Sequence, residues 1–278
     1  MSNITSQDIQ YIRDWMAKED YLPKDFSDMM IMKFLHSCYG SLEQTKQCIE
    51  KFCVGRLNMP EIFTNRDPLS PKLQTAFSIT NMASYNAGEC EILLYQIDDP
   101  TLENFDFYDT LKMFLLLSDN WIKCHPVYAE GHIFLLDMQH YFLKIIPKIN
   151  IFYYRQFLLY LLEAMPMRLK AVHAFNCPSY YEKLYSLVKP VLPQEICDLI
   201  HFHPTVEGLY KSIDKKHLPT ELGGEAPSMR KQMADWVNSV EESREFYLDD
   251  NLWKAIPTKK SKAMENAMNG SFRTLSID

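Results

Sequence analysis

The chain has 278 residues, of which 47% are hydrophobic, so it can bury a sizeable core as one large domain or two modest ones. A formal net charge of −7 argues against general nucleic-acid binding, because the phosphate backbone requires a basic face. The seven cysteines are odd in number and lack Cys-x-x-Cys spacing, so they carry no zinc or redox signature.

The chain begins with short predicted helices. Thr5 starts a capping pattern before apolar residues at helical spacing, and a second helix is predicted near residues 27–38. Ser41 starts a third helix, and the proline-containing stretch 65–72 is typical of a linker. The first residues are polar where a signal peptide would be apolar, and no apolar run reaches transmembrane length. We therefore expect a reduced cytoplasmic protein.

The second part of the chain alternates strand-length and helix-length patterns. Short apolar runs at 91–96, 132–138 and 171–177 predict strands. Helical patterns at 109–124 and 149–165 lie between them. This alternation predicts an α/β domain with a largely parallel sheet.

Residues 180–192 are apolar on most sides of a predicted helix. A helix of that kind must be buried or must cover something apolar.

The sequence lacks the common catalytic signatures, including G-x-S-x-G, the phosphate-binding glycine loops and H-E-x-x-H. His201 and His203 could present two imidazoles on one side of an extended segment, but a metal site needs a third ligand. Asp137 and His140 lie at the end of a predicted strand, where active sites often occur, but no nucleophile accompanies them. We therefore predict no enzymatic activity, metal or cofactor.

Several segments, taken in order, resemble the CRAL-TRIO family of lipid-binding proteins. The similarity covers nearly the whole chain and includes an L-P-x-x-x-G-G signature near the end of the α/β part. The last segment is similar to insect members that resemble the alpha-tocopherol transfer protein. The segments are Met32–Phe52, Glu130–Tyr141, Pro166–His203, Leu218–Glu225 and Gly270–Asp278.

The resemblance implies an α/β fold in which an N-terminal helical bundle precedes a CRAL-TRIO domain. It implies a helical domain at 1–75, a lipid-binding domain at 85–245 and a C-terminal tail at 246–278. An apolar cavity is expected over the sheet, closed by a lid helix within 178–199. This lid agrees with the independent interpretation of 180–192.

The resemblance also implies which side chains line the cavity and which form the lid. Expected pocket residues are Leu111, Phe114, Ser118, His132, Leu136, Tyr141, Leu143, Phe157, Tyr160, Leu161, Met165, Leu169 and Val172. Expected lid residues are Tyr180, Tyr181, Leu184, Tyr185, Leu187, Val188, Val191 and Leu192. Ser118 or His132 would orient a hydroxyl or carbonyl group of the ligand.

Members similar to the tocopherol transfer protein bind phosphoinositide headgroups in a basic cleft. Arg168 and Lys170 match two positions of that cleft, whereas Glu195 and Leu199 occupy two others. From the residues alone, Arg168 and Lys170 could equally be a solvated strand entry. The resemblance therefore implies only weak coupling to phosphoinositides.

The expected function is the binding and transfer of a tocopherol, retinoid, carotenoid or similar isoprenoid by a monomer that contacts membranes transiently. The alternatives are a protein that exchanges or senses phospholipids or phosphoinositides, and an interaction module of the same fold without a ligand.

Overall fold

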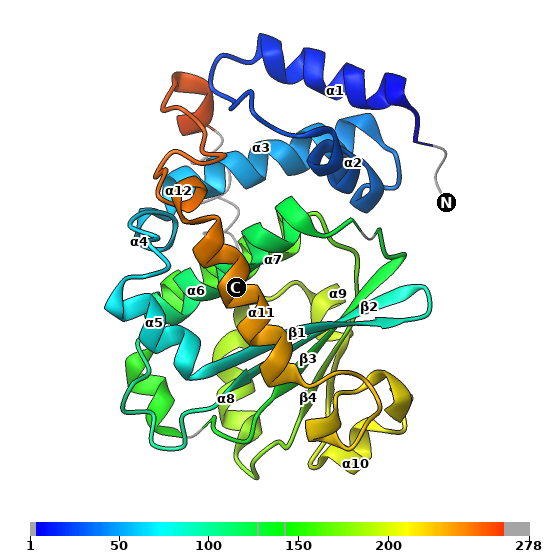
Figure 1. Ribbon diagram of the computed structural model, residues 1–278, viewed down its shortest axis with the longest axis vertical. Coiled ribbons are helices and arrows are strands. Elements are labelled where there is room, and N and C mark those ends of the chain that lie inside the picture. Colours follow the sequence, from blue (N-terminus) through cyan, green and yellow to red (C-terminus); the bar gives the residue numbers. More distant parts are fainter. Residues whose placement is uncertain (1–3, 127, 142, 264–278) are drawn as a thin grey trace.

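The computed structural model describes residues 4–126, 128–141 and 143–263, and Gly270–Asp278 lies outside this part. The N-terminal region is helical, as predicted, and lies above the α/β part in Figure 1. Side chains of Thr5, Ser27, Ser41 and Ser70 accept backbone N–H bonds at four of the helix starts. These helices are α1 (Ser6–Lys18), α2 (Asp28–Ser37), α3 (Leu42–Asn58), α4 (Pro60–Phe63) and α5 (Pro71–Ser78).

The expected linker 65–72 is partly helical. Ser70 caps α5 and Pro71 occupies its first turn, where the missing N–H of proline costs nothing. Two residues of the predicted linker therefore belong to α5, which packs against the domain that follows.

The α/β part contains a mixed sheet of five strands in the order β1-β2-β3-β4-β5. The strands β2 to β5 are parallel to one another, whereas β1 is antiparallel to β2. Gly88, with a φ of +70°, closes the tight turn of the β1–β2 hairpin. The strands are β1 (Thr80–Ala87), β2 (Cys90–Ile97), β3 (Gly131–Asp137), β4 (Leu169–Phe175) and β5 (Ile200–Phe202).

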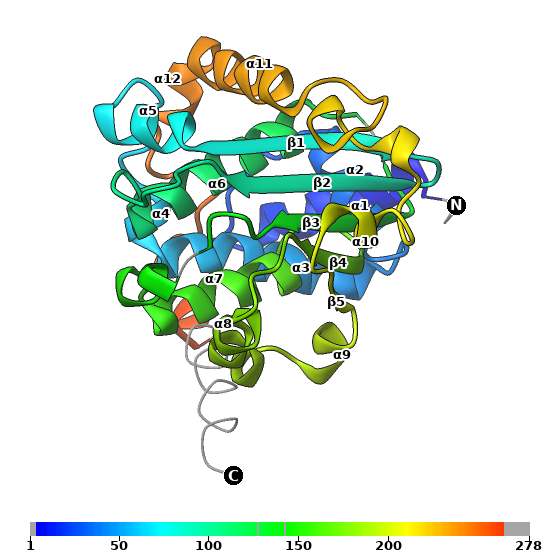
Figure 2. The same cartoon turned by 90° about the horizontal axis from the view of Figure 1, so that it is seen from below.

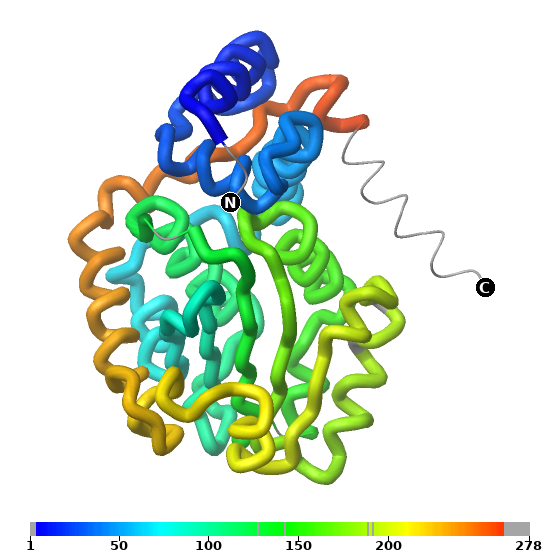
Figure 3. The backbone as a smooth tube through the Cα atoms, turned by 90° about the vertical axis from the view of Figure 1, so that its right-hand side faces the viewer, coloured from blue at the N-terminus to red at the C-terminus, as the bar shows by residue number. Residues whose placement is uncertain are grey.

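Two helices lie at opposite edges of this sheet. Figure 2 and Figure 3 show α11 (Met229–Glu242) beside β1 and α8 (Tyr181–Val188) at the far edge beside β5. Gln232 of α11 accepts the backbone N–H of Ser84 at 3.2 Å, so this helix covers the edge strand β1. The edge on the β5 side is covered by the shorter helices α8 and α9 (Gln194–Cys197).

Each face of the sheet has its own hydrophobic core. The larger core lies between the sheet, α6 (Phe107–Cys124), α7 (Ile151–Glu163) and the N-terminal helices. The smaller core lies on the opposite face, beneath α10 (Val206–Leu209) and the segment that leads into α11. The remaining elements are short: α12 (Arg244–Tyr247) and the 3-10 turns Leu143–Lys148, Lys189–Val191, Lys215–His217 and Thr220–Leu222.

The segment after α11 returns to the N-terminal helices (Figure 1). Trp253 is buried there, and the backbone N–H groups of Ala255 and Ile256 donate to the carbonyls of Cys53 and Tyr21. The described part of the expected C-terminal tail therefore packs against the helical region. In the described residues, no helix is both long and apolar enough to cross a membrane.

Candidate functional site

The sheet presents a row of apolar side chains to the larger core. The register aligns Leu93 of β2, Phe134 of β3, Val172 of β4 and Ile200 of β5 across the sheet, so their side chains point to one face. All four are only partly buried, although β2, β3 and β4 are internal strands.

The opposite face of the same strands is packed differently. Ile92, Leu94 and Leu135 alternate with the row just described and are fully buried in the smaller core. These three side chains are therefore more deeply buried than the row on the larger-core side, although Ile133 on their own face is also partly buried. We call the row Leu93–Phe134–Val172–Ile200 the apolar floor.

Aromatic rings from α6 and α7 stand over this floor. The ring of Phe114 lies 6.5 Å from Phe134 and 5.7 Å from both Tyr95 and Phe157. On α7, Tyr154 and Leu158 are partly buried and pack against the same core, as does Leu161 one turn later. These three residues repeat at i, i+4 and i+7, so they occupy one helix face.

Helix α8 docks at the β5 end of the floor. Tyr181 and Tyr185 place their rings 4.8 Å and 5.0 Å from Phe202, and Leu184 packs against the larger core. The Tyr180 hydroxyl donates to the Tyr141 carbonyl at 3.3 Å. None of the described α8 side chains is fully buried. The described contacts of this helix are therefore all only partly buried.

The sequence comparisons identify the family. A family model described as "CRAL/TRIO domain" matches residues 85–224, half of the chain. The chain belongs to the CRAL-TRIO family. This family binds lipids and is not enzymatic, in agreement with the sequence-based prediction. A second model, "Pinta-like, UBA domain", matches residues 2–73 of this CRAL-TRIO chain.

Similar proteins match most of the CRAL-TRIO chain at low identity. The mouse protein "Alpha-tocopherol transfer protein-like" is 23% identical over 88% of this chain and 71% of its own length. Clavesin-1 of Xenopus laevis is 26% identical over 84% of this chain and 71% of its own length. The crystal structure of Sfh5 aligns with a TM-score of 0.51 at 11% identity, over 97% of this chain and 99% of that one. The Sfh5 likeness shows the fold alone.

The structure brings part of the predicted pocket together at the floor. Phe114 and Phe157 belong to the aromatic group over Phe134, and Val172 is part of the floor itself. Leu111, Leu136, Tyr141, Leu161 and Met165 lie in or against the same core. The sequence prediction omitted Leu93, Phe134, Ile200 and Phe202. The alternation of side chains along a strand places Phe134 between His132 and Leu136, and this signal could have found it.

Other predicted pocket residues lie away from the floor. Tyr160 packs against the N-terminal helices, with its ring 6.0 Å from Phe52 and 5.3 Å from Phe63. Leu143 is exposed in a 3-10 turn, and Leu169 pairs with His132 at the opposite end of the strands. Ser118 donates its hydroxyl to the Phe114 carbonyl at 2.8 Å within α6.

The expected lid is shorter than predicted. Its helix ends at Val188, and residues 189–191 form a 3-10 turn because proline at position 190 cannot continue the α-helical bonding. The outer side of α8 is polar, with exposed Glu182, Lys183 and Ser186, although Leu187 is also exposed. Leu192 is partly buried, and the side chains of Val188 and Val191 lie outside the described part of the structure.

His132 belongs to a polar junction at the amino ends of β2 and β3. Its Nδ1 accepts the backbone N–H of Arg168 at 3.0 Å, and its Nε2 lies 3.7 Å from a carboxylate oxygen of Glu91. Trp121 donates its indole N–H to Glu91 at 3.2 Å. Burial lowers the pKa of His132, so the neutral ring is favoured there.

Arg168 is buried and already neutralised. Its guanidinium lies 2.7 Å from Glu130, donates to the His36 carbonyl and stacks 3.9 Å from the Tyr39 ring centre. This side chain therefore connects β4 to α2.

The other positions of the expected phosphate cleft carry little positive charge. Lys170 is exposed, with its aliphatic stem against Gly131. Glu195 is exposed on α9, and Leu199 precedes β5. Of the two predicted phosphate-binding cations, Arg168 and Lys170, only Lys170 is exposed to solvent.

Three histidines gather on the face opposite the floor. His173 of β4 pairs in register with His201 of β5, and its Nδ1 lies 2.9 Å from Nε2 of His203. Within the described residues, no group of three histidine, cysteine or acidic side chains is arranged to hold a metal ion. Burial, with the neighbouring charges of His201 and His203, lowers the pKa of His173 to about 4.

This histidine group predicts a loss of stability in acid. An unfolded histidine titrates near pH 6.5, whereas folded His173 takes up its proton only near pH 4. The unfolded state thus binds more protons between these values, so the free energy of unfolding should fall as the pH drops from 6.5 to 4, by on the order of 2 kcal/mol. Urea unfolding across this range should show a shallower fall for His173→Gln, while His217→Gln should match the wild type. Equal slopes for wild type and His173→Gln would contradict this assignment.

Proposed function

We propose that this CRAL-TRIO chain binds one small hydrophobic molecule of the tocopherol, retinoid, carotenoid or related isoprenoid type and transfers it between membranes in the cytoplasm. The ligand lies on the apolar floor, and α8 closes over it. The observation that carries the proposal is the partial exposure of Leu93, Phe134 and Val172 on three internal strands, beside Ile200 of β5, whereas Ile92, Leu94 and Leu135 on the other face are fully buried.

The binding energy in this proposal comes from removing apolar surface from water. A ligand of sterol or tocopherol size loses several hundred Å² of exposed area, worth on the order of 10 kcal/mol at about 25 cal/mol per Å² before the costs of association. Spontaneous release into water is then slow. A membrane that accepts the ligand and loosens α8 therefore determines the rate of transfer.

The polar groups near the floor favour a ligand without a charged headgroup. The hydroxyls of Ser118 and Tyr180 already donate to backbone carbonyls. Arg168 is paired with Glu130, so a phospholipid phosphate would have to break this partly buried ion pair to reach it. These contacts support the isoprenoid over the phospholipid, as does the name of the mouse relative.

Three exposed apolar side chains support contact with a membrane. Phe152 begins α7 and is 79% exposed, Leu143 lies in the turn before α7, and Leu187 lies on the outer side of α8. Exposed apolar side chains around a lipid site can insert into the membrane interface. In this proposal they bring α8 to the bilayer at which the ligand is loaded.

Native mass spectrometry tests the proposal directly. Protein is incubated with phosphatidylcholine vesicles that contain α-tocopherol or retinal and is then re-isolated. We expect one isoprenoid molecule per chain. Retention of phosphatidylcholine instead would support phospholipid exchange. If the protein retains no lipid from either vesicle or from a total lipid extract, both the isoprenoid carrier and the phospholipid-exchange hypotheses are overturned. The remaining hypothesis would then be an interaction module without a ligand.

The rate of loading tests the membrane contact in the same experiment. Phe152→Asp should slow loading several-fold without changing the final amount, because it removes an inserted side chain and not the floor. Leu69→Asp is the matched control, since Leu69 is also exposed, at 52%, but lies in the loop before α5. Equal slowing in both variants would remove Phe152 from the membrane contact.

A further inference from the structure

A pocket with a volume of about 310 Å³ lies at the carboxyl ends of β2, β3 and β4. Gln96, Asp137 and Asn176 contribute from the ends of these strands, Glu221 from the segment before α11, and Arg230 from the first turn of α11. Two of the sequence segments singled out above meet here. The segment Glu130–Tyr141 supplies Asp137, and the L-P-x-x-x-G-G signature supplies Glu221 and Gly223.

This pocket is separate from the apolar floor. Asp137 follows Leu135 on the side of β3 that faces the smaller core, whereas Phe134 and Leu136 point to the larger one. Gln96 follows Leu94 on that same side of β2. A lipid on the floor would therefore not contact these polar side chains. They lie at the carboxyl ends of the parallel strands, where ligands of open α/β sheets usually bind.

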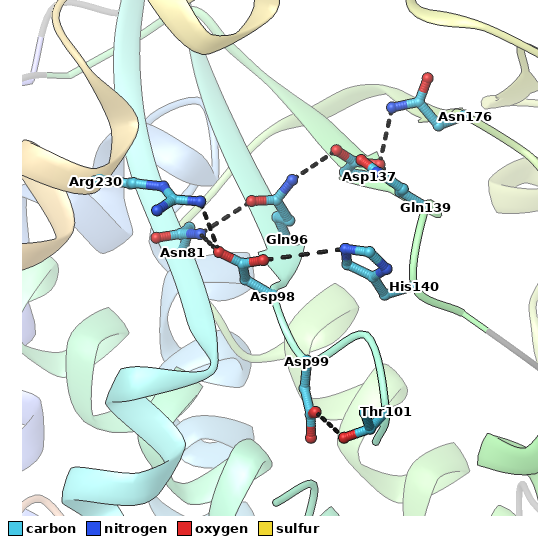
Figure 4. Close-up of polar contacts among 10 residues, drawn as sticks. All are labelled: Asn81, Gln96, Asp98, Asp99, Thr101, Asp137, Gln139, His140, Asn176 and Arg230. Atoms are coloured by element: carbon cyan, nitrogen blue, oxygen red, sulfur yellow. Dashed lines mark hydrogen bonds and ion pairs between the residues drawn. The ribbon is translucent and has the colours of Figure 1, made fainter. Parts of the chain in front are cut away.

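Asp137 is the fixed centre of the pocket wall (Figure 4). Its carboxylate is buried and accepts three hydrogen bonds: from Gln96 at 2.8 Å, from Asn176 at 3.0 Å and from the Gln139 backbone N–H at 3.0 Å. Gln96 is oriented in turn by Asn81, which donates to it at 2.9 Å. The wall is thus held rigid before any ligand arrives.

Asn176 is held in an unusual backbone conformation to reach Asp137. Its φ is +52°, in the left-handed region that few residues other than glycine adopt. Asparagine tolerates this conformation better than most residues other than glycine. Here it aims the side-chain amide at the buried carboxylate.

The charges of the pocket exclude anionic ligands. Arg230 is the cation in the described wall, and it lies 2.9 Å from Asp98, while Asp137 and Glu221 add two more carboxylates. Glu221 is already saturated by the Ser228 hydroxyl and two backbone N–H groups. A phosphate or carboxylate would therefore meet a net negative wall.

The unused hydrogen-bonding groups comprise both donors and acceptors. Among the described residues, the Asp137 carboxylate retains one accepting position, the Asn176 amide retains one N–H and its carbonyl, and the Gln139 side chain has no protein partner. Hydroxyl groups suit such a mixture because each both donates and accepts. Val206, Leu222 and Met229 supply an apolar side for the C–H face of a ring.

We propose that this pocket is a second ligand site, which binds a small, neutral, polyhydroxylated molecule such as a monosaccharide or polyol. Its volume suits a single ring at the lower end of the range for small-molecule sites. The site is independent of the lipid floor and lies on the other face of the sheet.

Saturation-transfer NMR with glucose, ribose and sorbitol tests this site. We expect transfer to at least one of these probes with the full chain. Asn176→Gly deletes the amide at a φ that glycine accepts, and Gln139→Trp fills the pocket from an exposed position; both should reduce the signal at least tenfold. Gln47→Trp, at an exposed position on α3, is the control and should bind like the wild type.

The outcomes separate this proposal from the lipid function. Transfer to none of the neutral probes would overturn the site, as would an unchanged signal in both pocket variants. Binding of glucose 6-phosphate at least as tight as that of glucose would overturn the neutral class of ligand. Tocopherol loading should be unchanged in Asn176→Gly and Gln139→Trp, so failure of either proposal leaves the other standing.

Discussion

Asp119→Ala is expected to unfold the chain or to lower its free energy of unfolding by about 3–5 kcal/mol. Asp119 lies fully buried on α6, where its two carboxylate oxygens bind two arginines from the N-terminal region. Nη1 of Arg56 lies 2.9 Å from Asp119, and Nη1 of Arg66 lies 2.5 Å from it. Without the carboxylate, two guanidinium groups would remain buried with no counter-charge.

The aromatic rings around the triad of Asp119, Arg56 and Arg66 should increase the loss of stability. The Arg56 guanidinium lies 4.1 Å from the Phe52 ring centre and 4.6 Å from that of Phe63, so water reaches it poorly. Burial raises the pKa of the Asp119 carboxyl, but the two arginines outweigh it and hold this pKa below its usual value. The carboxylate therefore stays ionised and joins the helical region to α6 throughout the physiological range.

Urea unfolding followed by circular dichroism measures the effect. Asp235→Ala on the exposed side of α11 is the control and should change stability by less than about 0.5 kcal/mol. Adding Arg56→Met and Arg66→Met to Asp119→Ala should restore part of the loss, because apolar side chains can replace a buried ionic group. An Asp119→Ala protein with an unchanged urea midpoint would show that the triad does not stabilise the fold.

Local signals in the sequence predicted the helices and the central strands well. The capping patterns at Thr5 and Ser41 start helices where expected, since such caps depend on residues only three positions apart. The strand β1 was not predicted, because its sequence TNMASYNA mixes polar and apolar residues without clear alternation. It is a strand because it pairs with the adjacent β2 and is covered by α11, and α11 lies more than a hundred residues further along the chain.

The candidate site was predictable in its elements but not in its individual side chains. Helical periodicity places Tyr160 on an apolar face of α7 but cannot tell which neighbour that face meets. In the structure its ring approaches Gly55 of α3, a contact between residues a hundred positions apart. The sequence also could not show that Arg168 is neutralised. Its contacts with Glu130 and with the His36 carbonyl depend on the docking of α2.

Adding bulky side chains at the floor should abolish lipid binding. Val172→Trp adds a large ring at the centre of the floor, and Leu161→Trp adds one from α7. Because both side chains are partly exposed now, the new rings should occupy the place of the ligand rather than disrupt a packed core. We expect each variant to lose at least about 100-fold in affinity for α-tocopherol, equivalent to roughly 3 kcal/mol.

The matched control lies on the other face of the same sheet. Ile133 is partly buried like Val172, but its side chain points to the smaller core, so Ile133→Trp should cost up to about 3 kcal/mol of stability through overpacking and leave tocopherol binding intact. Titration of α-tocopherol by tryptophan fluorescence, with melting curves for each variant, separates lost binding from lost folding. If Val172→Trp and Leu161→Trp both fold and both bind like the wild type, the ligand does not lie between the floor and α7. If Ile133→Trp alone loses binding, the lipid lies on the opposite face of the sheet.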